Sequence, residues 1–533
     1  MSETLYNGIE LPAPWPPREA DPQSLQPMRV PYLEKPPAVI PIDGGRQLFV
    51  DDFLIAQCSL APVHHQPVKY PANPVFFPQT DWERNDRLPP CTVPKCGGIW
   101  YDDRLGKLRM WYMASYLGVM AHAESRDGVH WERTETDVVP GSNLILSPDL
   151  HPDSGTVFID PAGDPDARYK MLIREPNDER GGCFPARLYL SADGFHWREI
   201  GQTGPMDDRS TMFYNPFRKK WVQSIRAWLP PRCRCRLYWE HADFLQSAAW
   251  ARGDPPFWAG ADCLDEPGDD RPQLYNLDAV GYESLMLGLF QILKGPPNHI
   301  GEATGTPKLT ELTVAFSRDG FHWHRPCRRA FIGARREPGS WERGYVESTG
   351  GVCLIAGDEL WFYYSAYAGD PKRVGVAWGV NGMYANGAVG LAKLRRDGFT
   401  SLQARFPGAE VLTRPVQFSA GECLFVNANT AGAELRAEAL DEQGKPLDGY
   451  EAAACVPFIG NSTCARLRWK NHDTLGPLRN RPVRFRFTLD RGDFYAFWVS
   501  PGADGASGGY TAAGRLPGLA SANCLSSLTD ACP

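Results

Sequence analysis

The sequence predicts an all-β protein, a five-bladed β-propeller followed by a C-terminal β-sandwich. A seven-residue motif recurs as SRDGVHW, SADGFHW and SRDGFHW at 125–131, 191–197 and 317–323. Short alternating or apolar runs precede each copy, a pattern typical of strands. The chain also holds 52 glycines and 48 prolines, as expected for many short strands joined by turns. Amphipathic 3.6-residue periodicity, which would favour helices, is almost absent.

The spacing of the motif indicates five repeat units. The first two copies start 66 residues apart and the next follows after 126, so one copy should lie between them. The segment HADFLQSAAW at 241–250 keeps a turn-like Asp and a closing Trp, and RRDGFTSL at 395–402 is a further degenerate copy. Repeats of this kind form the blades of a propeller, in which each unit is one sheet.

The motif itself is interpreted as a structural turn. Asp-Gly forms a tight turn between strands, where the Asp side chain accepts backbone N–H groups and Gly supplies a positive φ. The Trp can then pack between neighbouring sheets. Two further strand candidates precede each motif, so every blade would contain four strands. The segment RQLFVDDFLI at 46–55 is expected to add a strand that closes the ring.

Four regions follow from this interpretation. Residues 1–45 form an N-terminal extension and residues 46–402 form the propeller. Beyond the propeller the strand candidates lack the Asp-Gly-x-x-Trp unit, which predicts a small β-sandwich at 403–501. Residues 502–533 are rich in Gly, Ala and Ser, and we expect this tail to pack loosely.

Composition narrows the class of function. With 56 Lys and Arg against 63 Asp and Glu, the net charge of −7 argues against a nucleic-acid partner. No apolar run is long enough to span a bilayer and the N-terminus lacks the pattern of a signal peptide, so a cytoplasmic protein without a membrane partner is expected. The 14 irregularly spaced cysteines are interpreted as free thiols. No metal site or cofactor is predicted, although a calcium or sodium ion among axial acids stays open.

Acidic residues recur at the strands predicted to line the propeller axis. Asp153 and Asp208 begin the matching segments DSGTVFIDP and DRSTMFYNP, Asp278 lies in the fourth unit and Glu347 in the fifth. These acids should point into one funnel, although each taken singly could simply cap a turn. Clustered carboxylates raise the pKa of at least one member, and a carboxylic acid beside a carboxylate is what glycosidic bond cleavage requires.

Other residues on the same face are candidates for substrate binding. Aromatic candidates for stacking on sugar rings, or for packing between blades, are Trp82, Tyr275, Trp341 and Tyr345. Lys95 and Arg226 could bind hydroxyls or a charged substituent, with a solvated rim position as the alternative. Arg209 is expected to keep the neighbouring Asp208 ionised.

In its repeat turns, axial acids and trailing sandwich, the chain resembles the five-bladed propeller glycoside hydrolases of families 32, 43 and 68. The segments LFVDDFLI, PQLYNLDAVGYESLMLGLF and SRDGFHWHRP look closest to bacterial family-32-like proteins of unassigned substrate. In the characterised families an Asp of blade one is the nucleophile or base, an Asp of blade two stabilises the transition state or tunes pKa values, and a later Glu is the acid. Asp153 matches the blade-two position. The blade-one signature would fall on VPKCGG at 93–98, which holds no acid, and blade three shows Asp208 and Arg209 in place of a Glu-Cys pair.

The leading hypothesis is a glycoside hydrolase that cleaves a terminal sugar, with a furanoside as one candidate. Glu347 is the expected general acid, Asp208 the nucleophile or base, Asp153 a third working carboxylate and Asp278 a hydroxyl ligand. A carbohydrate-binding or protein-interaction propeller without catalysis is the alternative. A lyase or a phosphorolytic enzyme on the same scaffold is the third hypothesis.

Overall fold

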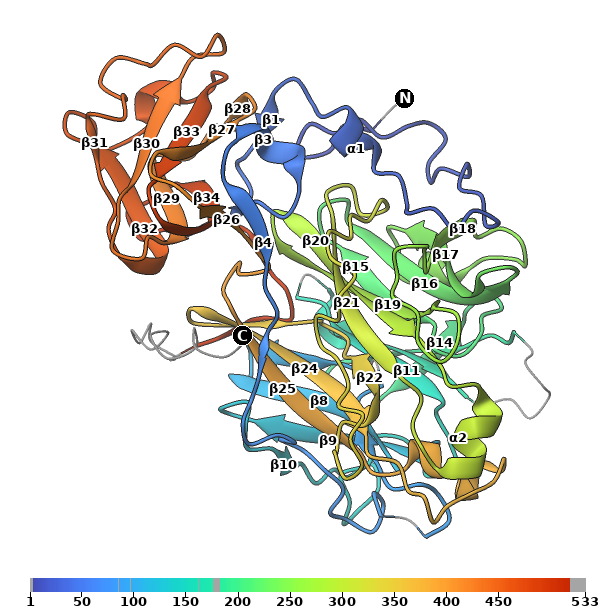
Figure 1. Ribbon diagram of the computed structural model, residues 1–533. Helices are drawn as coiled ribbons and strands as arrows, with labels where there is room; N and C mark the ends of the chain where they lie inside the picture. The colour runs from blue at the N-terminus through green and yellow to red at the C-terminus, as the bar shows by residue number, and fades with distance from the viewer. Residues whose placement is uncertain (1–2, 85, 96, 162, 176–182, 518–533) are drawn as a thin grey trace.

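The computed structural model describes residues 3–517 except 85, 96, 162 and 176–182. It confirms an all-β propeller, and this propeller is joined to a β-sandwich. Figure 1 shows the propeller sheets in the lower and right-hand part of the view and the sandwich at the upper left. Helices in the described residues are short, which agrees with the lack of helical periodicity. They are α1 (Pro31–Glu34), α2 (Asn298–Thr304) and the 3₁₀ turns η1 (Asp52–Leu54), η2 (Pro165–Ala167), η3 (Gln246–Ala248), η4 (Trp378–Val380), η5 (Gly382–Tyr384) and η6 (Gly476–Leu478).

Five sheets follow one another along the propeller part of the described chain, and we number them sheets 1 to 5. Sheet 1 contains β6 (Thr92–Val93), β7 (Ile99–Asp102), β8 (Lys107–Ala114), β9 (Val119–Ser125) and β10 (Glu132–Arg133). Sheet 2 contains β11 (Ser154–Ile159), β12 (Tyr169–Arg174), β13 (Arg187–Ser191) and β14 (Arg198–Gln202). Sheet 3 contains β15 (Thr211–Asn215), β16 (Lys220–Leu229), β17 (Cys233–His241) and β18 (Phe257–Gly260).

Sheets 4 and 5 each include short strands from distant parts of the chain. Sheet 4 contains β19 (Gln273–Glu283), β20 (Leu285–Leu293), β21 (Thr310–Ser317) and β35 (Tyr510–Thr511). Sheet 5 contains β22 (Gly344–Ser348), β23 (Leu354–Ala356), β24 (Glu359–Tyr367), β25 (Gly387–Arg395), β5 (Val68–Lys69) and β36 (Arg515–Leu516). Both ends of the chain therefore help to complete the propeller.

Successive sheets contact one another in a closed ring. β7 lies against β11, β11 against β15 and β15 against β19, while β22 contacts β20 and β21, and β25 returns to β6. Hydrogen bonds reinforce this order, since the Val157 N–H donates to the Gly97 carbonyl at 2.6 Å and the Ile99 N–H to the Gly350 carbonyl at 3.2 Å. Because the first strand of each sheet lines the centre, side chains of different sheets converge on the axis.

Each complete copy of the repeat motif ties its sheet to the preceding one. Side-chain donors of one sheet bind the turn carbonyls of the next through Trp111 Nε1 to Gly194 (2.9 Å), Trp258 Nε1 to Phe321 (2.7 Å) and Tyr363 Oη to Gly128 (2.6 Å). The motif glycines Gly128, Gly194 and Gly320 have φ between +79° and +81°. A Cβ on any of them would lie 2.1–2.8 Å from a side chain of the preceding sheet. The turn therefore requires Gly, and the motif fastens neighbouring sheets together.

The sandwich takes strands from both ends of the chain. One sheet has the order β31-β32-β29-β34-β26-β4, with β2 also on β34, and the other has the order β3-β27-β33-β30. The strands of the first sheet are β31 (Cys455–Val456), β32 (Asn461–Trp469), β29 (Cys423–Asn429), β34 (Gly492–Ser500), β26 (Thr400–Ala404), β4 (Ala61–His64) and β2 (Gln47–Leu48). Those of the second are β3 (Ile55–Cys58), β27 (Ala409–Thr413), β33 (Arg484–Leu489) and β30 (Leu435–Leu440), and β1 (Ile40–Pro41) pairs with β28 (Val416–Gln417) nearby.

The segment at 46–55 does not close the propeller, so that prediction is wrong. β2 pairs with β34 and β3 pairs with β27, which places this segment in the sandwich. The outer edge of sheet 5 is closed instead by β5, which pairs with β25. The boundary predicted at residue 402 falls inside β26, whose partners are β34 and β4.

The described part of the C-terminal tail packs against one end of the propeller axis. β35 pairs with β19 and β36 pairs with β23, and these segments line a cavity of about 500 Å³ together with Phe158, Tyr214 and Val280. These residues lie further along the inner strands than the axial acids do, since Phe158 of β11 follows Asp153 and Val280 follows Asp278 on β19. The expectation of loose packing is wrong for 510–516, and residues 518–533 lie outside the described residues.

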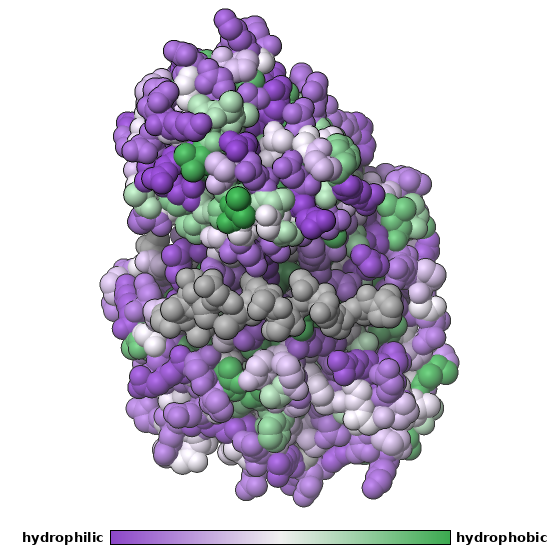
Figure 2. Space-filling view, turned by 60° about the vertical axis from the view of Figure 1, so that its left-hand side comes forward, coloured by the Kyte–Doolittle hydropathy of each residue, from purple (hydrophilic) through white to green (hydrophobic). Residues whose placement is uncertain are grey.

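The outer surface offers no broad apolar face in the view of Figure 2. Hydrophilic residues cover most of that face and hydrophobic residues are scattered among them. In the described part of the chain, no helix has the length and apolar character needed to cross a membrane.

Candidate functional site

Charged side chains from all five sheets meet at the end of the axis where the inner strands begin. Lys95 follows β6, Asp153 directly precedes β11 and Arg209 lies two residues before β15. Asp278 lies on β19 and Glu347 on β22. All five side chains are buried. The axial register inferred from the repeats therefore places these residues on one face of the propeller.

Asp153 is held as a carboxylate by two cations. Lys95 Nζ lies 2.8 Å from Asp153 Oδ1, and Arg174 Nη1 lies 3.3 Å from Oδ2. Burial raises the pKa of Asp153, but the charges of Lys95 and Arg174 outweigh burial and hold the pKa below its ordinary value. Arg174, at the end of β12, carries no repeat signal in the sequence, and sequence analysis missed it.

The pKa of Glu347 is shifted in the opposite direction from that of Asp153. It is 2% exposed, its Oε1 lies 3.4 Å from Arg209 Nη2, and its buried Oε2 accepts no hydrogen bond from the described residues. Burial raises its pKa, the charges of Arg209 and Lys95 lower it, and Asp278 and Asp153 raise it further, so that the pKa lies above its ordinary value. Glu347 therefore tends to keep its proton where Asp153 has lost one.

Arg209 does not pair with its neighbour Asp208, contrary to the prediction. Its guanidinium faces Glu347, and Arg226 takes the expected role by pairing with Asp208 and with Asp207 at 3.2 Å. The Asp208 side chain is 30% exposed, whereas Arg226 is buried rather than at a solvated rim. Asp208 thus lies nearer the solvent than Glu347 does.

Asp278 is already bound within the protein. Its Oδ2 accepts a hydrogen bond from Ser348 Oγ at 2.5 Å and another from Asn276 Nδ2 at 2.9 Å. Ser348 directly follows Glu347 on β22, so Asp278 connects sheet 4 to the strand that carries Glu347.

Tyrosine rings lie beside the axial charges, and Lys95 Nζ is 4.6 Å from the ring centroid of Tyr116. Tyr116 and Tyr384 stack with ring centroids 4.0 Å apart and an interplanar angle of 8°, and Tyr345 lies 5.3 Å from Tyr384. Tyr275 lies 6.4 Å from Tyr345, and burial raises the pKa of Tyr275 to about 12. Sequence analysis identified Tyr275 and Tyr345 but missed Tyr116 and Tyr384, which lie outside the repeated segments.

The two tryptophans predicted at this face lie elsewhere or make no contact with the cluster. Trp341 packs against Tyr364 of sheet 5, with centroids 5.7 Å apart, which is the alternative role of packing within the propeller. Trp82 is 37% exposed, and in the described ranges no ring contact joins it to the axial tyrosines. Its carbonyl accepts a hydrogen bond from Ser115 Oγ, directly before Tyr116.

Three of the 14 non-glycine residues with positive φ in the described part of the chain belong to this site. The non-glycine residues Lys95, Arg209 and Tyr345 have φ of +44°, +58° and +45°. Each such conformation costs on the order of 1–3 kcal/mol and persists where the surroundings enforce it, often at functional sites. All three residues contact the acids or flank them in sequence.

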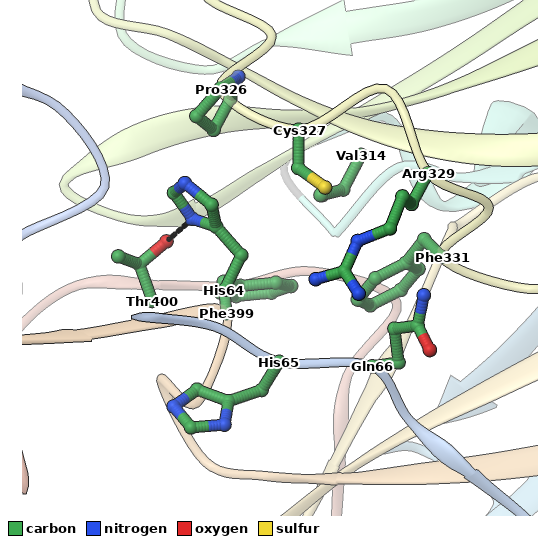
Figure 3. A pocket seen from close by; sticks show the side chains of 10 residues that line it. All are labelled: His64, His65, Gln66, Val314, Pro326, Cys327, Arg329, Phe331, Phe399 and Thr400. Atoms are coloured by element: carbon green, nitrogen blue, oxygen red, sulfur yellow. Dashed lines mark hydrogen bonds between the residues drawn. The ribbon is translucent and has the colours of Figure 1, made fainter. Parts of the chain in front are cut away.

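Cavities elsewhere in the fold do not include the axial acids. Figure 3 shows a pocket of about 10 Å³ beside Phe399, where His64 Nδ1 and Thr400 Oγ1 lie 3.0 Å apart, and this space holds no more than one water molecule. A cavity of about 600 Å³ lies between the N-terminal extension and sheets 3 and 4. No group of three or more His, Cys, Asp or Glu within the described ranges is arranged to hold a metal ion.

Comparisons with known proteins give only a distant likeness. The chain matches no protein-family model, and no curated protein is significantly similar to it in sequence. An N-acetylgalactosamine deacetylase from F. plautii in complex with blood group B trisaccharide is 15% identical, with 64% of this chain and 96% of that chain covered and a TM-score of 0.39. A thermostable family-43 glycoside hydrolase is 13% identical, with 58% and 95% covered and a TM-score of 0.38. A glycosyl hydrolase from Bacteroides ovatus is 12% identical, with 66% and 97% covered and a TM-score of 0.41. At these identities and scores the likeness assigns no activity to this chain.

Proposed function

We propose that the chain is a carbohydrate-active enzyme that cleaves a glycosidic bond at the axial site, with Glu347 as the general acid. The observation that carries this proposal is the pair of buried carboxyl groups with opposite pKa shifts, raised at Glu347 and lowered at Asp153. Surroundings that push two pKa values apart are typical of an acid and base pair. Glycoside cleavage needs a carboxylic acid that protonates the leaving oxygen and a carboxylate that attacks the anomeric carbon or activates water.

Asp153 is the ionised partner in this proposal. The sequence hypothesis gave the nucleophile or base role to Asp208, but the Asp208 side chain is 30% exposed, whereas Glu347 is buried. Asp153 is buried and acts on the pKa of Glu347 directly. We therefore place Asp208 at the rim of the site, with Asp278 as a hydroxyl ligand and a terminal sugar, a furanoside among the candidates, as substrate.

One observation favours the non-catalytic alternative, a carbohydrate-binding propeller. Glu347 is 2% exposed, so a substrate reaches it only if surrounding side chains move. This alternative predicts sugar binding without turnover, and the experiment below distinguishes the two.

The test uses initial rates on a panel of 4-nitrophenyl furanosides and pyranosides. On the sugar that is cleaved, Glu347→Gln should lower kcat at least about a hundredfold, and less on the matching 2,4-dinitrophenyl glycoside, whose leaving group needs little protonation. Asp153→Asn should lower both rates alike. Glu199→Gln, on the exposed outer strand β14, is the matched control and should keep full activity.

If the wild type cleaves neither aryl glycosides nor oligosaccharides but binds sugar measurably, the protein is a carbohydrate-binding propeller and not a glycosidase. Equal losses for Glu347→Gln on both leaving groups would remove Glu347 from the acid role.

A further inference from the structure

A group of cations lies beside the acid pair on the side of sheets 3 and 4. The guanidinium of Arg234, on β17, lies 5.5 Å from the ring centroid of Tyr275, and that of Arg209 lies 5.7 Å from the same ring. The carbonyl of Lys308 accepts the N–H of Tyr345 at 2.8 Å, two residues before Glu347. Arg234 therefore shares the Tyr275 ring with Arg209, which pairs with Glu347, and Lys308 is bonded through its backbone to the strand that carries Glu347.

These two cations differ from the others of the site in their partners. Neither Arg234 nor Lys308 forms an ion pair with a carboxylate of the described residues, whereas Lys95, Arg174, Arg209 and Arg226 each pair with an acid. Arg234 Nη1 donates to the neutral Gln273 Oε1 at 2.7 Å, and Lys308 Nζ donates to the neutral Asn298 Oδ1. Lys308 is 4% exposed, so water does little to screen its charge.

The cations repel one another. Burial lowers the pKa of Lys308, and the charges of Arg234 and Arg226 lower it further, to about 8, although Glu302 and Asp270 act in the opposite direction. Burial likewise lowers the pKa of Arg226, and Arg234 adds to this effect. A bound anion would relieve this repulsion and would give each group the charged partner that it lacks.

We propose that the axial site takes a sugar that carries an oxyanionic group, a carboxylate or a sulfate ester, and that Arg234 and Lys308 bind this group. The role in cleavage rests on the proposed function, but binding of the anion does not require turnover. The planar guanidinium of Arg234 suits bidentate contact with a planar or tetrahedral oxyanion. Trp228, 53% exposed and 5.2 Å from the Arg234 guanidinium, is a natural reporter of occupancy.

The test is a titration of tryptophan fluorescence at low ionic strength, backed by calorimetry, with D-glucuronate, D-glucose 6-sulfate, D-glucose and inorganic phosphate. The wild type should bind an anionic sugar at least about tenfold more tightly than D-glucose. Arg234→Gln and Lys308→Gln should each remove this preference, and Arg234→Lys should restore part of it. Arg198→Gln, an exposed arginine on β14, is the matched control and should bind as the wild type does.

Three results would overturn the proposal. The first is equal affinity for neutral and anionic sugars. The second is an unchanged preference in Arg234→Gln and Lys308→Gln. The third is tighter binding of inorganic phosphate than of any anionic sugar, which would indicate a free anion.

Glu347→Gln separates this proposal from the proposed function. If this variant and the wild type cleave nothing but bind D-glucuronate through Arg234, the anion site stands and the hydrolase fails. If the wild type cleaves only neutral glycosides and binds no anion, the hydrolase stands and the anion site fails.

Discussion

Two sets of acidic side chains recur around the propeller, and the turn acids differ from Glu347 of the axial set in how fully they are hydrogen-bonded. In the repeat turns, Asp127, Asp193 and Asp319 each accept two backbone N–H groups and a histidine Nδ1, at 2.7–2.9 Å. Burial raises the pKa of these groups, but the histidine and amide hydrogen bonds outweigh it and lower the pKa of Asp127 and Asp193 to about 2. On the axis, by contrast, Glu347 Oε2 accepts no hydrogen bond from the described residues.

This difference in hydrogen bonding distinguishes acidic residues that stabilise the fold from an acidic residue that is available to bind or react. A carboxylate whose hydrogen bonds are made within its own turn stabilises that turn. A buried carboxyl oxygen without a partner costs stability, and such a cost is typical of sites that bind or react. Repetition alone did not distinguish the two sets, because both recur once per unit in several units.

The largest effect that the comparison predicts is on stability. Asp319→Ala should lower the free energy of unfolding by about 3 kcal/mol, because it removes several charge-assisted hydrogen bonds at a buried turn. Glu347→Gln should change it by less than about 1 kcal/mol, because only the contact with Arg209 is altered. Equilibrium urea unfolding measures both, with the exposed Asp448→Ala as control. Equal losses of unfolding free energy in Asp319→Ala and Glu347→Gln would contradict the distinction between structural turn acids and the axial acid.

A smaller effect is expected on the pH dependence of cleavage. The positive charge of Lys95 lowers the pKa of both Asp153 and Glu347. Lys95→Met should therefore raise both, and move the acid and the basic limb of the kcat/KM profile to higher pH, by about one unit or more for Asp153. Lys95→Arg should restore the profile. A uniform loss of rate with both limbs in place would show that Lys95 has only a structural role.

The sequence predicted the elements whose causes are local. The turn motif is visible because Asp, Gly and His bond within a few residues, as in the contacts of Asp319 with Phe321 and His322. Within the sandwich, the predicted strand candidates correspond to β29, β30, β32, β33 and β34, whereas β2 and β3 were assigned to the propeller. The closing strand β5 and the tail strands β35 and β36 have two residues each and pair with segments far away in the chain, so no local pattern identifies them.

Only part of the candidate site was predicted, because only some of its residues follow from a local sequence pattern. The axial acids were found through the repeat register, which fixes where each inner strand begins. Which cation meets which acid depends on long side chains from different sheets, so the Arg209–Glu347 and Arg226–Asp208 pairs were not predicted. Tyr116 and Tyr384 come from connections outside the repeats, and only the fold stacks their rings on each other.

The most direct test of the account is the protonation state of Glu347 itself. The infrared difference spectrum between the wild type and Glu347→Gln, recorded across a pH series, isolates the carboxyl band of this residue. The account predicts that the protonated band persists above the ordinary pKa of 4.5, while the Asp153→Asn difference shows an ionised group at and above 3.8. A Glu347 band that disappears at or below pH 4.5 would contradict the central claim that this residue is held as an acid.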